Sequence, residues 1–164
     1  MSLSEWWIDG DIARDAAGNL YAVWDTQGTN ADGSANDIGW LSFSTDGGKH
    51  WSAALQAPAD RLDAPHIMEV AGGGNGMAYV SWLSSSNPQG YALYLRAFSV
   101  TGGWLSAPFQ VSTQFGDTSV WPGDTTGIST LGANQVVVSW GSATGATNKK
   151  SDIFAAAVGV SLTH

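Results

Sequence analysis

A repeat of 58 residues constrains the fold of this chain more than any other feature. Three runs rich in β-forming residues end at Trp24, Trp82 and Trp140, which are spaced 58 residues apart. A β-branched residue stands twelve positions before each tryptophan, a Gly/Asn turn lies between the two, and a further apolar run follows. Self-similarity at a fixed period indicates a repeat architecture, in which each copy forms one supersecondary unit. We therefore expect three similar structural units.

The composition favours an all-β fold. The 164 residues include 21 Gly and 9 Trp, and only 12% are charged. Short runs of Val, Ile, Tyr and Trp alternate with clusters of Gly, Asn, Ser and Asp, which is typical of strands and turns. No long segment carries apolar residues at helical spacing. No apolar segment approaches the roughly 20 residues needed to cross a bilayer, so no membrane span is expected.

Charge and side-chain chemistry exclude several classes of partner and cofactor. Six Lys and Arg against 14 Asp and Glu give a net charge of −8, which argues against nucleic acid or an anionic membrane as the partner. The absence of cysteine excludes disulfides, thiol catalysis and cysteine metal sites. The three histidines are scattered without zinc-ligand spacing, and no phosphate-binding loop occurs. We therefore expect no metal and no cofactor.

A hairpin motif lies inside the first repeat. The pattern Ser-x-Asp-x-Gly-x-x-Trp is matched at its four fixed positions by Ser44, Asp46, Gly48 and Trp51. The Ser and Asp oxygens can accept hydrogen bonds from the amides of a tight turn, and the glycine permits a positive φ. Trp51 is expected to begin the return strand and to cover the hairpin. The second repeat keeps a shortened version, Ser99–Trp104, which lacks the Asp.

This repeated motif resembles the Asp-box (BNR) hairpin of sialidase-like β-propellers. The resemblance implies an all-β fold of three four-stranded antiparallel blades, at about residues 9–57, 64–112 and 122–161, within a six-bladed propeller. The third blade is incomplete, because the chain is too short for its outermost strand. Residues 1–164 then form a single three-blade segment. We expect a secreted or periplasmic location rather than a cytoplasmic one.

Three blades are too few to close a ring, since propellers close with about four to eight. Two explanations stay open. The segment is roughly half of a longer six-bladed chain, or two copies pair as a homodimer that completes six blades. In either case the first and last sheets would need a neighbour to cover their outer faces.

The connectivity of a four-stranded blade divides the loops between two ends. The box turns and the Gly/Asn turns share one end, so the box is expected to be structural. The resemblance places a ligand funnel at the opposite end, where polar and aromatic residues gather. The candidate ligand-binding residues there are Asp9, Asp11, Arg61, Asp63, His66, Trp121 and Asp124. Carboxylates beside aromatic rings suit a carbohydrate, although these Asp residues could instead cap turns and the Trp residues could seal blade interfaces.

The resemblance does not extend to the full catalytic set of a sialidase. That activity needs three arginines, a Tyr–Glu pair and an Asp acid/base, whereas only Arg61 is expected at the funnel. Arg14 falls on the box side, Arg96 lies far out on a blade, and no Tyr is evidently paired with Glu69. Three classes therefore remain: a glycoside hydrolase or part of one, a non-catalytic propeller that binds a glycan or protein, and a fragment without independent activity.

Overall fold

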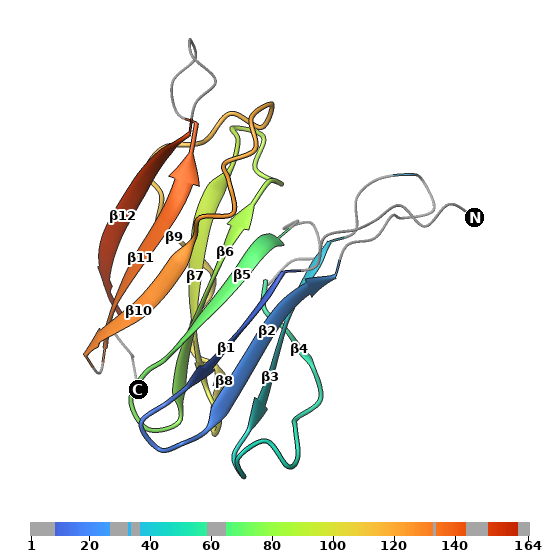
Figure 1. The fold of residues 1–164 in the computed structure, drawn as a ribbon, viewed down its shortest axis with the longest axis vertical. Helices are drawn as coiled ribbons and strands as arrows, with labels where there is room; N and C mark the ends of the chain where they lie inside the picture. Colours follow the sequence, from blue (N-terminus) through green and yellow to red (C-terminus); the bar gives the residue numbers. More distant parts are fainter. Residues whose placement is uncertain are drawn as a thin grey trace.

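The computed structural model describes residues 9–26, 33, 37–58, 65–132, 134–143 and 151–160. This part of the chain contains strands and no helix, so it holds no helix that could span a membrane. The strands form three antiparallel sheets that follow one another along the chain (Figure 1). The expected all-β fold and its division into three antiparallel sheets are confirmed.

Each sheet is an antiparallel meander. The first sheet consists of β1 (Gly10–Arg14), β2 (Leu20–Thr26), β3 (Ile38–Ser44) and β4 (Leu55–Gln56). The second consists of β5 (Pro65–Gly72), β6 (Met77–Ser84), β7 (Ala92–Ser99), β8 (Gly103–Trp104) and β9 (Phe109–Gln110). The third consists of β10 (Gly127–Gly132), β11 (Gln135–Ser142) and β12 (Asp152–Gly159).

Two details differ from the expected four-stranded units. The outer edge of the second sheet is divided between two short strands, β8 and β9, which both pair with β7, so this sheet has five strands. In the first sheet Trp51 does not begin the return strand, because β4 starts only at Leu55, and its side chain is 41% exposed. The third sheet has three strands among the described residues.

The tryptophans that define the repeat face an aromatic residue of the next strand in every sheet. The register pairs are Trp24–Trp40, Trp82–Tyr94 and Trp140–Phe154. Trp82 and Tyr94 stack with ring centroids 6.0 Å apart, and Trp140 and Phe154 with centroids 5.9 Å apart. Aromatic cross-strand pairs stabilise a sheet beyond the area they bury, which gives the 58-residue landmark a structural reason.

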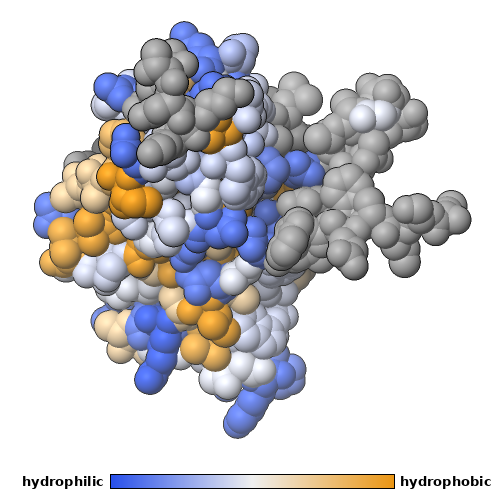
Figure 2. All heavy atoms as spheres, turned by 45° about the horizontal axis from the view of Figure 1, so that its top comes forward, coloured by the Kyte–Doolittle hydropathy of each residue, from blue (hydrophilic) through white to orange (hydrophobic). Residues whose placement is uncertain are grey.

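The core lies in two layers, one on either side of the second sheet. Tyr21, Val23 and Leu41 of the first sheet pack with Val80 and Trp82 of the second. Tyr79, Leu83 and Leu95, on the other face of the second sheet, pack with Val136, Val138 and Trp140 of the third. Strand β6 is therefore buried on both faces from Ala78 to Ser84. The third sheet is covered on one face only, and Figure 2 shows apolar side chains on the side where it lies in Figure 1.

The first strands of the three sheets, β1, β5 and β10, lie side by side. The Val70 amide donates to Asp11 Oδ2 at 3.0 Å, and Thr130 Oγ1 donates to the Gly72 carbonyl at 3.3 Å. A β-carbon at Gly72 would collide with the Arg14 carbonyl, so the close approach of β5 to β1 requires glycine. Corresponding positions of neighbouring sheets thus lie beside one another.

Candidate functional site

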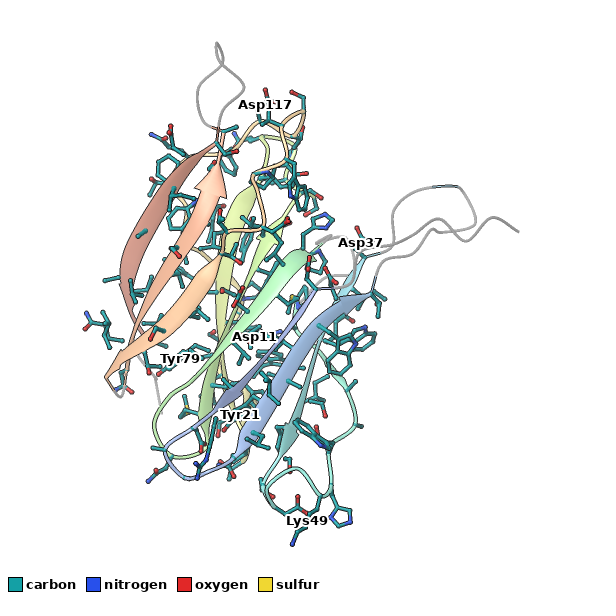
Figure 3. All side chains as sticks on the ribbon, in the orientation of Figure 1. Asp11, Tyr21, Asp37, Lys49, Tyr79 and Asp117 are labelled. Carbon is teal, nitrogen blue, oxygen red and sulfur yellow. The ribbon has the colours of Figure 1, made fainter. Side chains whose placement is uncertain are left out.

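The sheets have two chemically different ends. Arg14, Leu20 and Ser44 are aligned by register, which brings the β1–β2 turn (15–19) and the box turn (45–50) together; we call this the box end. The opposite site end holds Asp9, Asp25, Asp37, His66 and the segment 113–126. Figure 3 shows Lys49 of the box turn at one end of the molecule and Asp37 and Asp117 toward the other.

At the box end, the Asp-box residues bond to one another. Ser44 Oγ donates to Asp46 Oδ1 at 2.9 Å and accepts from the Gly48 amide at 2.9 Å. Asp46 Oδ1 accepts from the His50 amide at 3.0 Å, and Trp51 Nε1 donates to the Gly48 carbonyl at 3.2 Å. Hydrogen bonds from the His50 amide and ring, then from Ser44, lower the pKa of Asp46. The box residues therefore form a turn that is stabilised by hydrogen bonds among themselves.

A second carboxylate, Asp15, organises the β1–β2 turn and was not singled out from the sequence. Its two oxygens accept five hydrogen bonds of 2.8–2.9 Å, from Ala17 N, Asn19 N, Asn19 Nδ2, Tyr21 OH and Gly76 N. Burial opposes ionisation, but these donors prevail and lower the pKa of Asp15. The bond from Gly76 also ties the first sheet to the second. An Asp at the start of a Gly/Asn turn was the available sequence signal.

The site end contains a buried carboxylate, Asp25, which has few hydrogen-bond donors around it, in contrast to Asp15. Asp25 is fully buried directly after the landmark Trp24. Its Oδ1 accepts from the Asp9 amide at 3.0 Å, whereas Oδ2 has no hydrogen-bond partner among the described residues. Burial, reinforced by the nearby charges of Asp9 and Asp37, raises the pKa of Asp25 to about 6. This group therefore changes its protonation close to neutral pH.

His66 lies beside these carboxylates at the start of β5. Its Nε2 is 3.0 Å from Ser85 Oγ and 3.9 Å from Asp37 Oδ2, and its Nδ1 is buried without a partner in the described part of the chain. Burial lowers the pKa of His66, while Asp37 and then Asp9 oppose that shift. The neutral ring is favoured, with one nitrogen still able to bond.

Backbone strain occurs at the next residue. Ile67 has a φ of 52°, which is rare for a β-branched residue, and the β5–β6 register shifts between His66 and Glu69. Such a bulge redirects the side chains on either side of it, and strain of this kind concentrates at functional sites. Because Ile67 is buried in the second core layer, its packing holds the strained backbone in place.

The bulge leads to a pair of carboxyl groups on adjacent strands. Glu69 shares a side-chain hydrogen bond with Asp11, and its Oε1 accepts from Thr126 Oγ1 at 3.0 Å. Burial raises the pKa of Glu69; the Thr126 bond opposes this, and the neighbouring Asp11 adds to it. The carboxyl group of Asp11 therefore favours the protonated form of Glu69. The pair thus connects β1, β5 and the segment before β10.

An aromatic group completes the site end. The rings of His66, Tyr91 and Trp121 meet edge to face, with centroids 5.8–6.5 Å apart. Trp121 is 47% exposed, and its Nε1 donates to Asp124 Oδ1 at 2.8 Å. The carboxylate therefore fixes the orientation of a half-exposed indole. This arrangement offers a flat apolar surface next to hydrogen-bond acceptors.

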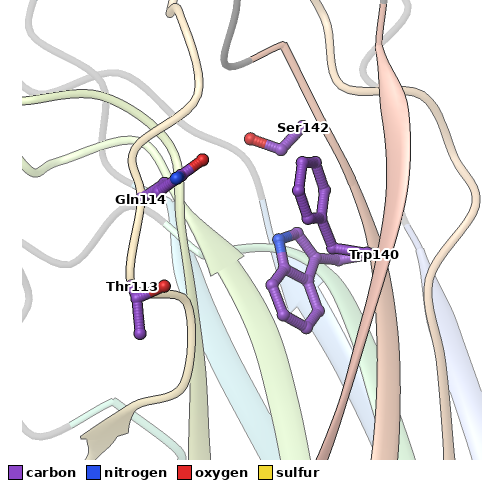
Figure 4. A pocket seen from close by; sticks show the side chains of 5 residues that line it. Thr113, Gln114, Trp140 and Ser142 are labelled. Carbon is purple, nitrogen blue, oxygen red and sulfur yellow. The ribbon is translucent and has the colours of Figure 1, made fainter.

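A hollow of about 130 Å³ lies between the third sheet and the segment that follows β9 (Figure 4). It is lined by the Trp140–Phe154 stack together with Thr113, Gln114 and Ser142. The Ser142 hydroxyl is buried and has no hydrogen-bond partner among the described residues. Sequence reasoning assigned Trp140 only a structural role, because strand pairing alone does not show which loop closes over a sheet end.

The structure brings together most of the residues predicted for the funnel. Asp9 lies beside Asp25 and near His66, while Trp121 and Asp124 bond to each other and Trp121 packs on His66. Asp11 is directed between strands by its bond to the Val70 amide. Arg61 and Asp63 lie outside the described residues. The site residues not predicted are Asp25, Asp37, Tyr91 and Thr126, which are single residues at strand ends without a motif.

The two arginines among the described residues, Arg14 and Arg96, lie away from the site end. Arg14 is exposed at the end of β1 that leads into the box end. Arg96 donates from Nε to the Ser106 carbonyl at 2.8 Å and from a terminal nitrogen to the Ala57 carbonyl at 2.7 Å, and it lies over Trp104. Among the described residues, no group of three or more His, Cys, Asp or Glu side chains is arranged to hold a metal ion.

No family model matches the chain, and no curated protein matches it significantly.

Proposed function

We propose that this chain is a sialidase-like Asp-box β-propeller segment that binds a carbohydrate at its site end. The proposal is supported by three successive meander sheets and by their first strands, β1, β5 and β10, which lie side by side. It is also supported by the Asp-box turn, which is closed by its own hydrogen bonds and lies far from the site residues. In such a segment the box stabilises a turn, and recognition falls to the loops at the opposite end.

One observation carries the choice of ligand. Trp121 is half-exposed, its indole is held by Asp124, and His66 and Tyr91 support it edge to face. A fixed indole face can stack on the C–H surface of a sugar ring, and neighbouring carboxylates can accept hydrogen bonds from its hydroxyls. Asp124 is placed for that second role by its bond to Trp121.

Hydrolysis of a glycoside is the second candidate, favoured by the raised pKa of Glu69, which suits a general acid. Glycoside hydrolases, however, hold their two carboxyl groups roughly 5–9.5 Å apart, and Glu69 and Asp11 share a hydrogen bond. That pair is too close for the reaction. Binding without hydrolysis is therefore our first proposal, and a hydrolase would need a different second carboxylate.

A glycan array followed by calorimetric titration tests the proposal. Trp121→Ala should weaken binding of any positive glycan at least tenfold, which corresponds to about 1.4 kcal/mol. Trp51→Ala is a matched control, because Trp51 is similarly exposed (41%, against 47% for Trp121) but lies at the box end. Equal losses in both variants, or no loss at Trp121, would remove this site.

The same glycans separate binding from hydrolysis. If wild-type protein binds a glycan without releasing a sugar from it, the hydrolase candidate fails. If it does release sugar, Glu69→Gln should abolish the release while binding persists. A chain that neither binds nor cleaves any glycan would contradict both candidates and favour a protein partner or an inactive fragment.

A further inference from the structure

The two outermost sheet faces differ from every internal face, because nothing in the described chain covers them. The second sheet is buried on both faces, against the first and the third sheet. The first sheet uses one face for this contact, as does the third. The 58-residue repeat identifies which internal face each uncovered face corresponds to.

The uncovered side of the first sheet carries bulky apolar residues. This tryptophan face consists of Ile12, Ala22, Trp24 and Trp40, which register places on one side of the sheet. Ile12 is 61% exposed. One repeat later, Ile12, Ala22 and Trp24 correspond to Val70, Val80 and Trp82, all buried in the contact with the preceding sheet.

The uncovered side of the third sheet carries small residues at its centre. This small-residue face consists of Ser129, Val137, Ser139, Ala155 and Ala157, and by register Ile153, which is 63% exposed, lies on the same side at the end of β12. A hollow of about 270 Å³ lies over Gly127, Ser129, Val137 and Ser139. One repeat earlier, Val137 and Ser139 correspond to Tyr79 and Ser81, which lie on the face of the second sheet that packs against the third.

We propose that a second copy of the chain covers both faces head to tail. The tryptophan face of one copy packs on the small-residue face of the other, and the reverse contact closes a two-fold ring. This repeats a contact that the chain makes twice internally, with hydrogen bonds between near-corresponding positions: Val70 to Asp11, and Thr126 to Glu69. A contact between unlike faces closes into a ring when the rotation permits it.

The shapes of the two uncovered faces favour a contact between unlike faces. Two tryptophan faces would oppose their bulky side chains, and two small-residue faces would bring two hollows together. Close packing is achieved when projecting groups fill hollows; Ile12, 61% exposed, projects from the tryptophan face, and the hollow over Val137 lies on the small-residue face. The occupant that fits the small-residue face is therefore the tryptophan face of another copy.

Light scattering on the purified full chain tests this inference. The wild type should have twice the mass of the 17.1 kDa chain at micromolar concentration. Ile12→Asp and Val137→Lys should each give a monomer that keeps its far-ultraviolet circular dichroism spectrum. Mixing the two variants should restore the dimer, because the mixed pair has one wild-type contact and one contact between opposite charges. Phe109→Asp, an exposed apolar residue on β9 away from both faces, should stay dimeric.

Several results would overturn the inference. A wild-type monomer would show that no second copy binds, and a larger ring or polymer would show that two copies do not close. If Val137→Lys remains dimeric while Ile12→Asp does not, the tryptophan faces meet each other instead. If the mixture stays monomeric although both variants are folded, the two faces are not partners. None of these outcomes depends on a carbohydrate.

Discussion

Carboxyl side chains have opposite roles at the two ends of the sheets. At the box end the carboxylates of Asp15 and Asp46 accept hydrogen bonds from nearby donors, and their pKa values are lowered. At the site end Asp25 is buried and Glu69 is half-buried, both near other carboxylates, and their pKa values are raised. A carboxylate supplied with many donors stabilises a turn, whereas a desolvated carboxylate with few donors costs free energy and marks a candidate site. The number of nearby donors, more than burial itself, separates structure from function here.

The largest effect is expected from Asp15→Asn. The substitution keeps the size of the side chain but removes the charge and turns an NH2 group toward donors such as the Tyr21 hydroxyl and the Gly76 amide. Loss of this buried network should lower the free energy of unfolding by about 2–3 kcal/mol. Urea unfolding measures it, with Asp152→Asn as the matched control because Asp152 is exposed on β12.

The pH dependence of that variant sharpens the comparison. Because the folded-state pKa of Asp15 lies below its ordinary value, its contribution is present above that value and is lost as the pH falls through the folded pKa. The difference between wild type and Asp15→Asn should therefore shrink in acid. A constant difference from neutral pH down to pH 3 would show that the charge of Asp15 contributes nothing.

The site end should respond to pH in the opposite direction. The pKa of Asp25 is raised from 3.8 to about 6, so folding favours its protonated form, and wild-type stability should fall as the pH rises between these values. Asp25→Asn removes this titration. From pH 4 to pH 7 the variant should gain roughly 1–3 kcal/mol relative to the wild type. Urea unfolding at both pH values measures this; an unchanged difference would mean that Asp25 has an ordinary pKa when folded.

The sequence predicted the box end better than the site end. The 58-residue period predicted three sheets, and the box pattern predicted a turn bonded through Ser44 and Asp46, because both signals depend on neighbours in the chain. The Glu69–Asp11 contact and the packing of Trp121 on His66 join residues more than fifty positions apart. Their placement depends on the bulge at Ile67 and on how sheets pack, and neither leaves a local pattern.

The smallest effects are expected inside the box turn. Ser44 is buried, and its hydroxyl joins Asp46 to the Gly48 amide, so Ser44→Ala should lower the free energy of unfolding by about 1 kcal/mol. Asp46→Ala should cost less, because that side chain is exposed and water can replace it at the His50 amide. The two changes should be less than additive, since both residues belong to one network.

The shortened box is a natural comparison: Thr101 stands in place of the Asp, and Ser99 accepts only longer bonds of 3.3 Å from the Thr101 and Gly102 amides, so Ser99→Ala should cost less than Ser44→Ala. Thermal unfolding ranks the three variants, and titration with a glycan bound by the wild type should give unchanged affinity for all of them. A loss of affinity at Ser44 or Asp46 without a loss of stability would mean that the box end, and not the end that carries Trp121, meets the ligand.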